Sequence, residues 1–511
     1  MALMMTTIDT GNVRGVLCGN PLITVFKGIP YGAPTSGQNR FAPPQPAEKW
    51  TGERICDSFP DICYQPEMTP GIPFMDFFIK EFYPHRYPMS ENSLALNVWT
   101  PAETPTEKLP VMVWIHGGGL STGYGHEMEF DGEAIARRGV VLVTIQYRVD
   151  VLGWFAHPDL TRESPYDMSG NNWLFDQIAA LQWVQRNIGA FGGDPANVTI
   201  FGQSAGGGSV VSHLISSKSN GLFAKAIIQS GSFGVAGDTR MSTQLSAGEA
   251  WGVKACEILS QSVVGLRAMS GLEAYQALKY AEENGAGPAP RQLIDPYLLP
   301  MSAAKAFATG QAKNIPLMVG SVSGDGGLFV EPDLKPDERK KHAIQMRLGQ
   351  NADEFFTQFS LDGSGGKIAD AIINAGPSLG DMAVALGQVK NGHLPSYVYY
   401  FDPFIPEHNI APFVEDGLAY HSSEMWYIFG VLNRCWRRFD GRHFDLSQAM
   451  TDYWTNFAKT GNPNGSGLPK WPAFRADQQS MLRLNERRII DESLQSDDLD
   501  RFFAFFHESL T

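Results

Sequence analysis

A serine flanked by two glycines, placed between a predicted strand and a predicted helix, constrains the fold of this chain more than any other feature. Residues 198–201 form a short apolar run that predicts a buried strand, and the run leads directly into Gly202, Ser204 and Gly206. Residues 209–216 then have the pattern of a helix. Glycine at both flanks permits a turn tight enough to expose the serine hydroxyl. This context favours Ser204 as a nucleophile over an ordinary turn serine.

The rest of the chain alternates strand-like and helix-like runs. Residues 140–145 are an apolar, β-branched run, which is typical of a strand covered on both faces in a parallel sheet. Helices are expected over residues 173–187, where apolar residues recur on one face, and over most of 240–310. Further strands are expected at residues 13–17, 23–26, 94–99, 109–115, 226–229, 317–319 and 397–400. The alternation predicts an α/β fold with a large, mainly parallel central sheet flanked by helices, a small N-terminal β-region and helical insertions.

Domain boundaries are absent from the sequence. The 511 residues contain no linker-like run, charge block, low-complexity stretch or repeat that would separate units. Chain length alone would suggest several domains, but the lack of a boundary favours one. We therefore expect a single domain over residues 1–511, with 43% hydrophobic residues to fill a large core.

A second glycine-rich motif follows the predicted strand at residues 109–115. It begins at His116 and places three glycines in a row, of which Gly118 and Gly119 are candidate donors. Bare backbone N–H groups can approach the oxyanion that forms when a serine attacks an ester, and Ala205 offers a third such group. A flexible glycine-rich turn is the alternative interpretation.

A nucleophilic serine needs a histidine base and an acid that orients it, and in this fold the acid and then the histidine follow the serine along the chain. His421 lies in a loop between an apolar strand region and a predicted helix that begins at Met425. Asp325 lies in the glycine-rich loop 320–327, directly after a predicted strand. Because loops that follow strands build such sites, these two residues are the candidates.

Charge and composition exclude several classes of partner. The net charge of −14 argues against nucleic acid and anionic membrane surfaces. Residues 1–7 do not have the pattern of a signal peptide, and no run of about 18 apolar residues suggests a membrane span. We expect no metal and no cofactor, because the chain has neither HExxH nor clustered Cys and His ligands. The cysteines are odd in number and widely spaced, which argues against a disulfide framework and for the cytoplasm: Cys18, Cys56, Cys63, Cys256 and Cys435.

Taken together, these motifs resemble the type-B carboxylesterase and lipase family, which includes cholinesterases and bacterial para-nitrobenzyl esterases. The resemblance extends from about residue 7 to residue 505 and rests on residues 26–32, 90–98, 116–119, 180–188, 191–195, 202–207, 459–465 and 471–472. It implies the α/β-hydrolase fold. It also implies a catalytic triad of Ser204, Asp325 and His421 and an oxyanion hole formed by Gly118, Gly119 and Ala205.

The chain departs from the family pattern in three places. The family usually has glutamate where Asp325 stands. Secreted members have a cysteine in place of Ser93, bonded to the one that matches Cys63, so here that disulfide cannot form. The aromatic segment 63–93, which is loop-rich up to residue 87, does not clearly present the tryptophan of choline-binding members, and its phenylalanines suggest an apolar lid or pocket wall.

The sequence therefore predicts a serine carboxylesterase that hydrolyses neutral, small-to-medium carboxylic esters through an acyl-enzyme intermediate. A lipase for longer-chain acylglycerols is the first alternative, and the same triad could cleave amides or carbamates. A non-catalytic adhesion-type relative is disfavoured because Ser204, its glycines and His421 are intact. No sequence feature identifies the physiological ester or the oligomeric state.

Overall fold

The computed structural model describes residues 1–71, 73–83, 85–236, 243–325, 338, 341, 344–345, 352–360, 379–407 and 417–494. Contacts among the residues divide the chain into two compact units. The first comprises Met1–Glu67, Pro84–Ala224 and Arg240–Met301, and the second comprises Met68–Tyr83, Lys225–Thr239 and Ser302–Thr511. Each unit combines parallel strands with helices, as the sequence predicts for the α/β class. The single domain expected over residues 1–511 stays a prediction.

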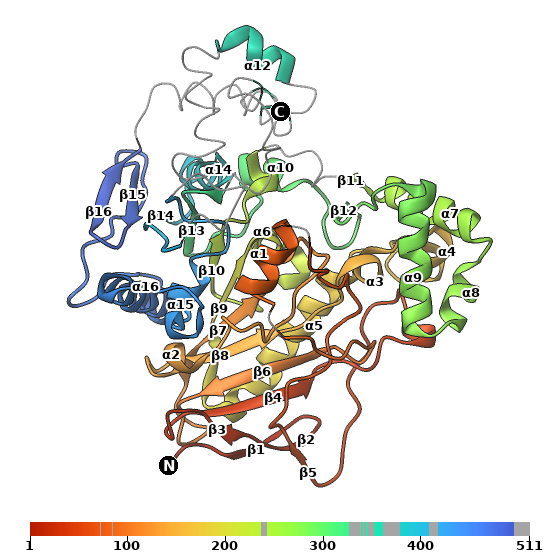
Figure 1. Ribbon diagram of the computed structural model, residues 1–511, viewed down its shortest axis with the longest axis horizontal. Coiled ribbons are helices and arrows are strands. Elements are labelled where there is room, and N and C mark those ends of the chain that lie inside the picture. The colour runs from red at the N-terminus through yellow and green to blue at the C-terminus, as the bar shows by residue number, and fades with distance from the viewer. Residues whose placement is uncertain are drawn as a thin grey trace. The chain divides into compact units, whose positions relative to one another are not determined.

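The sheet of the first unit is built around three parallel strands. Its strand order is β9-β7-β8-β6-β4-β3, in which β8 and β9 run parallel to β7 and the remaining strands join antiparallel (Figure 1). Every residue of β8 is buried, which confirms the expectation for this apolar run. A separate three-stranded sheet, β1-β2-β5, forms the N-terminal β-region. The bounds are β1 (Met5–Ile8), β2 (Gly11–Arg14), β3 (Val16–Leu17), β4 (Thr24–Pro30), β5 (Glu53–Ile55), β6 (Ala95–Thr100), β7 (Leu109–Ile115), β8 (Val141–Ile145) and β9 (Gly193–Gln203).

Helices α5 and α6 of the first unit pack against β9. Helices α7 and α9 pack against each other in the predicted helical insertion (Figure 1). Short parallel strands β11 (Thr243–Gln244) and β12 (Leu293–Ile294) flank that insertion. The helix bounds are α2 (Glu133–Ala136), α3 (Asp150–Trp154), α4 (Pro158–Glu163), α5 (Asn172–Asn187), α6 (Ala205–Ile215), α7 (Leu245–Leu259), α8 (Val263–Ala268) and α9 (Gly271–Ala281), with short turns η1 (Gly37–Asn39), η2 (Ile188–Phe191), η3 (Ser217–Ser219) and η6 (Glu282–Ala286).

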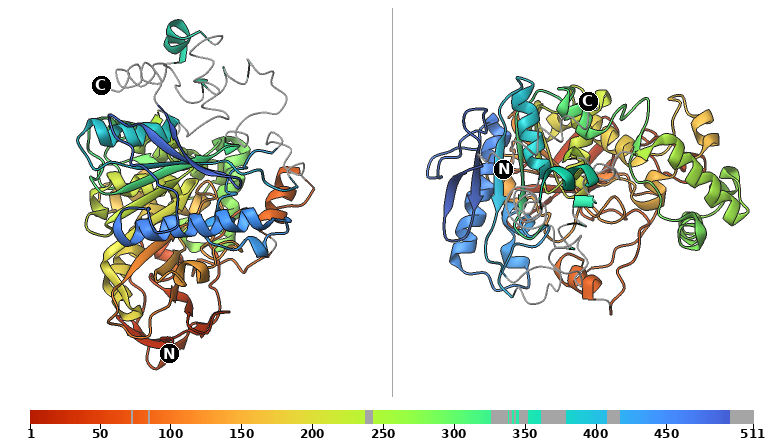
Figure 2. Two further views of the ribbon diagram at one scale, coloured as in Figure 1. Left: turned by 90° about the vertical axis from the view of Figure 1, so that its left-hand side faces the viewer. Right: turned by 90° about the horizontal axis from the view of Figure 1, so that it is seen from above.

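The second unit has its own run of parallel strands. Their order is β16-β15-β14-β13-β10, and only β16 is antiparallel to its neighbour among these strands. Helix α14 packs against β13 and β14, and α15 packs against α16, the long blue helix in the left view of Figure 2. The bounds are β10 (Lys225–Gln229), β13 (Leu317–Val322), β14 (Tyr397–Phe401), β15 (Ser480–Leu484), β16 (Ile489–Ser493), α1 (Pro73–Glu81), α10 (Ala303–Ala308), α12 (Ala352–Gln358), α14 (Leu379–Lys390), α15 (Met425–Ile428) and α16 (Gly441–Thr460), with turns η4 (Phe233–Ala236) and η10 (Leu432–Arg434).

The structure corrects one sequence-based expectation, the loop-rich character of residues 63–87. Residues 73–81 form helix α1, so the prediction was wrong for this segment. The helix begins at Pro73, and proline suits the first helical position because the missing N–H needs no partner there. Phe77, on the buried face of the helix, is only 3% exposed. Aromatic density alone could not distinguish a loop from the buried face of a short helix.

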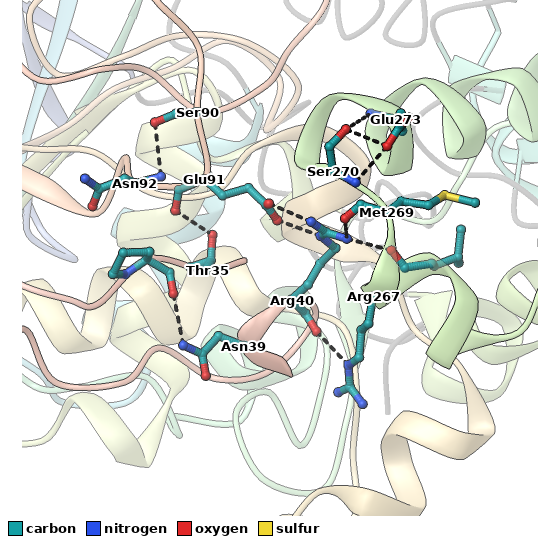
Figure 3. Close-up of polar contacts among 12 residues, drawn as sticks. Thr35, Asn39, Arg40, Ser90, Glu91, Asn92, Arg267, Met269, Ser270 and Glu273 are labelled. Atoms are coloured by element: carbon teal, nitrogen blue, oxygen red, sulfur yellow. Dashed lines mark hydrogen bonds and ion pairs between the residues drawn. The ribbon is translucent and has the colours of Figure 1, made fainter. Parts of the chain in front are cut away.

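A buried ion pair anchors the helical insertion of the first unit. The guanidinium of Arg40 donates to both carboxylate oxygens of Glu91, at 2.6 and 2.7 Å (Figure 3). Its remaining nitrogen donates to the carbonyl oxygens of Leu266 and Met269, at 2.6 and 3.0 Å. Both side chains are almost fully buried. The pair therefore holds the segments before β6 against the turn between α8 and α9.

All five cysteines lie in the described part of the chain and carry thiols rather than disulfides. Cys63 is buried and its sulfur approaches the carbonyl oxygen of Val149 at 3.9 Å. Burial raises the pKa of the Cys63 thiol to about 12 and that of the Cys56 thiol to about 11. These groups are therefore poor nucleophiles near neutral pH. Within the described ranges, no helix is both long enough and apolar enough to cross a membrane.

Candidate active site

Ser204 stands at the junction of β9 and α6, as the sequence predicts. It follows the last residue of β9 and occupies the N-cap position of α6, with φ 56° and ψ −124°. An L-residue adopts this backbone region only when the surrounding structure imposes it, and such strain concentrates at functional sites. The strained turn is the conformation that presents a serine hydroxyl at the end of a sheet.

At this turn the start of α6 passes very close to the end of β7, and this explains why glycine stands at position 206. A Cβ placed on Gly206 would lie 2.0 Å from the carbonyl oxygen of Ile115, the last residue of β7. No side chain fits at that distance, so only glycine allows the start of α6 to contact the end of β7. Gly202 is equally restricted, because its Cβ would lie 2.5 Å from the carbonyl oxygen of Gly206.

The loop after β7 is held beside Ser204 by its own backbone. A Cβ on Gly117 would lie 3.2 Å from the Cβ of Ser204. Gly118 has φ 94°, a conformation that favours glycine, and its carbonyl oxygen accepts hydrogen bonds from the N–H groups of Ser121 and Thr122, both at 2.9 Å. Arg291 donates through Nη1 to the carbonyl oxygen of the next residue, Gly119, at 3.0 Å.

His116 has a structural role in this loop. It is fully buried, its ring stacks on Tyr147 at a centroid separation of 4.2 Å, and its Nδ1 lies 2.9 Å from the carbonyl oxygen of Gly117. Burial lowers the pKa of His116 to about 4, so the ring stays neutral at physiological pH. Tyr147 also donates its hydroxyl to the carbonyl oxygen of His116 at 2.7 Å. These contacts fix the start of the glycine loop.

Three backbone N–H groups in the first unit are the predicted oxyanion donors, and that role stays a prediction. Among the described residues, no backbone hydrogen bond uses the N–H of Gly118, Gly119 or Ala205. Ala205 is the first residue of α6, where an N–H has no partner within the helix. Donors fixed in this way can stabilise a developing oxyanion without reorganising during the reaction.

In the second unit, the structure brings Asp325 and His421 together. The Nδ1 atom of His421 and the Oδ1 atom of Asp325 form a hydrogen bond, and both side chains are largely buried. The loops that carry them are joined by their backbones, because the N–H of Gly324 donates to the carbonyl oxygen of Ala419 at 2.7 Å. Ser323 adds a side-chain contact by accepting from the N–H of Ala419 at 2.9 Å. The prediction that Asp325 and His421 belong to one triad with Ser204 stays a prediction.

The structure reveals a further carboxyl group close to His421 in the chain, that of Glu424, which the sequence did not identify. Glu424 lies three residues after His421 in the chain and is fully buried. Burial, assisted by the negative charge of Asp325, raises the pKa of Glu424 well above its ordinary value and favours its neutral form. The motif around His421 contains this glutamate, but only the structure reveals that the carboxyl group is buried.

Comparison with known proteins identifies relatives over nearly the whole chain. The sequence model of the carboxylesterase family matches residues 3–502. The para-nitrobenzyl esterase of Bacillus subtilis (strain 168) is 33% identical, over 98% of this chain and 99% of the relative. The human protein named cocaine esterase is 32% identical, over 96% of this chain and 89% of the relative. A solved structure named thermophylic PNB esterase covers 98% of this chain and 100% of its own, with 30% identity and a TM-score of 0.80.

The crossing at Gly206 generates the first prediction. Gly206→Ala should destabilise the protein by roughly 3 kcal/mol or more, because a methyl group cannot be accommodated against the Ile115 carbonyl without displacing the backbone. Thermal and urea unfolding measure this loss. Gly189→Ala is the matched control, since no atom lies within 4 Å of the added Cβ. Equal stability of the two variants would contradict the assigned crossing.

Proposed function

Because this chain belongs to the carboxylesterase family, and is therefore a carboxylic ester hydrolase with the α/β-hydrolase fold, we propose that it cleaves esters through an acyl-enzyme intermediate on Ser204. The observation that carries this proposal is the strained conformation of Ser204 at the start of α6, beside the glycine loop after β7. A merely structural serine has no need of that backbone conformation.

The proposed chemistry assigns one task to each residue. His421 takes the proton from Oγ of Ser204 through Nε2, since its Nδ1 faces Asp325, and Oγ attacks the ester carbonyl carbon. The N–H groups of Gly118, Gly119 and Ala205 stabilise the oxyanion of the tetrahedral intermediate. The carbon–oxygen bond to the alcohol then breaks, and the alcohol leaves with the proton held by His421.

Hydrolysis of the acyl-enzyme repeats these steps with water. His421 removes a proton from the water, the hydroxide attacks the acyl carbon, and Ser204 recovers its proton as the carboxylic acid leaves. Asp325 remains ionised throughout, keeps His421 in one tautomer and stabilises the imidazolium that forms twice per turnover. No step needs a metal or a cofactor.

We further propose neutral esters with small to medium acyl groups as substrates. Helix α1 supports this choice over long-chain acylglycerols, since Phe77 and Phe82 are buried within the second unit instead of forming an exposed apolar lid. A series of para-nitrophenyl esters separates the alternatives. Activity that declines from medium to long chains supports the esterase, and activity that rises with chain length and at an oil–water interface supports the lipase.

We also propose that the protein works in the cytoplasm. The five thiols support this location, and so does Ser93, which stands where secreted relatives carry the cysteine that pairs with the equivalent of Cys63. A reducing compartment keeps such thiols intact. Nucleic acid is not a proposed partner, since the net charge is −14.

Replacing the nucleophile tests the proposed function. Ser204→Ala should lower kcat by on the order of 10⁴–10⁶ with little change in melting temperature, because the attacking oxygen is lost while the fold is not. Ser212→Ala is the matched control, as it removes a buried hydroxyl from the same helix, one that donates to the carbonyl oxygen of Gly208 at 3.0 Å. Steady-state kinetics on a para-nitrophenyl ester measures both. Activity of Ser204→Ala close to that of the control would refute the assignment.

Replacing the acid tests the role of Asp325. Asp325→Asn keeps the shape but removes the charge, and should lower kcat by roughly 10²–10⁴. Asp325→Glu should leave partial activity, since the loop is arranged around a carboxylate one methylene shorter. Because aspartate is shorter than glutamate, the loop must come closer to His421, and the sequence suggests that Gly324, Gly326 and Gly327 permit this approach; Gly326 and Gly327 lie outside the described residues. If Asp325→Asn kept more than about a third of the wild-type kcat/KM, a loss under ~0.7 kcal/mol, another acid would have to serve.

A further inference from the structure

Tyr420, the residue before His421, is held from two directions. Its backbone pairs with Gly324, the residue before Asp325. Its hydroxyl donates a hydrogen bond to a carboxylate oxygen of Glu81, at the end of α1. The ring is packed by Phe77, edge to face at 5.2 Å, and by the guanidinium of Arg437 at 4.8 Å. The side chain of Tyr420 is therefore fixed against α1, and its backbone is fixed against the loop that carries Asp325.

Glu81 is the centre of this cluster. Its carboxylate also accepts from Nε1 of Trp436 at 2.7 Å and from Nε of Arg437 at 3.1 and 3.2 Å. The side chains of Glu81 and Arg437 are both fully buried. Burial and the charge of Glu81 raise the pKa of Tyr420 well above its ordinary value, so the phenol stays protonated and donates. The carboxylate thus accepts from three N–H and O–H donors on segments distant in sequence, and the thiol of Cys435 adds a weaker contact at 3.7 Å.

A buried ion pair of this kind is weak evidence for stability. Desolvation of the two charges offsets much of their attraction, and apolar residues of similar volume often stabilise a core as well. What the pair provides is a defined geometry, since a carboxylate with three directional donors has one arrangement and an apolar contact has many. One of these donors is the hydroxyl of Tyr420, the residue before His421.

We propose that Glu81 is a positioning residue, which acts through Tyr420 to hold the imidazole of His421 against Asp325. The inference rests on the proposed function, in which that pair is the base and its orienting acid. It assigns α1 a role in orienting the catalytic base. Loss of the contact leaves the nucleophile and the substrate-binding groups unchanged, so the chemical step should slow while substrate binding is kept.

Three variants and one control test the proposal. Glu81→Gln removes the charge, Tyr420→Phe removes only the hydroxyl and keeps the packed ring, and the third variant combines both. Tyr420→Phe leaves the Glu81–Arg437 pair intact, so its kcat tests the proposal even if Glu81→Gln folds poorly. The control is Glu91→Gln, which breaks the buried Arg40–Glu91 pair of the first unit (Figure 3). Its destabilisation should match that of Glu81→Gln without touching Tyr420.

The expected result is a fall in kcat of about 10- to 100-fold for both single variants, with KM nearly unchanged. The double variant should fall no further than the more affected single variant, because both changes act through one contact. The downfield proton resonance of the His421 Nδ1–H, assigned by its loss in His421→Ala, should broaden or shift. Glu91→Gln should keep the wild-type kcat and resonance.

Four outcomes would overturn the proposal: wild-type kcat in Tyr420→Phe, an unchanged resonance, additive losses in the double variant, or an equal fall in kcat for Glu91→Gln. Failure of the proposed function is distinguishable. Normal kcat in the Glu81 and Tyr420 variants with an inactive Ser204→Ala removes only this inference, whereas an active Ser204→Ala removes the serine mechanism itself.

Discussion

The close approach of the Ile115 carbonyl oxygen to Gly206 is the constraint on which the turn at Ser204 depends. A side chain at position 206 would place its Cβ 2.0 Å from that oxygen. With glycine there, the end of β7 contacts the start of α6, and the loop that follows β7 lies beside Ser204. Two motifs far apart in the sequence thereby lie side by side, as the proposed oxyanion hole requires. The strain at Ser204 is tolerated because the flanking strand and helix impose it.

In the second unit, backbone and side-chain contacts also fix the position of the candidate residues. A backbone pairing between Gly324 and Tyr420 sets Asp325 and His421 side by side, and the side chain of Tyr420 is fixed in turn by α1. In both units the groups that we propose as reactive lie among backbone contacts and buried polar networks, which leave few alternative arrangements. Preorganisation of this kind lets dipoles and charges act on a transition state without first rearranging.

Sequence reasoning predicted the parts of this structure that local patterns determine. The strand 109–115 has the predicted bounds, since its apolar run ends at a glycine motif. The turn at Ser204 followed from the motif around it, whereas the positions of Asp325 and His421 in loops made them only candidates and the family resemblance implied that they form a pair. Helix α1 was missed although Phe74, Phe77 and Phe78 stand at the helical spacing i, i+3 and i+4, because the helix is only 9 residues long and prolines lie on both sides of it in the sequence. The hydrogen bond between Glu81 and Tyr420 spans 339 residues, a separation at which no periodicity carries information.

The structure of the protein after reaction with an organophosphonate tests the central claim most directly, because the adduct resembles the tetrahedral intermediate. The account predicts phosphorus bonded to Oγ of Ser204. It also predicts the phosphonyl oxygen about 2.7–3.1 Å from the N–H nitrogens of Gly118, Gly119 and Ala205. Phosphorus on any other residue, or a phosphonyl oxygen turned away from those three N–H groups, would contradict it.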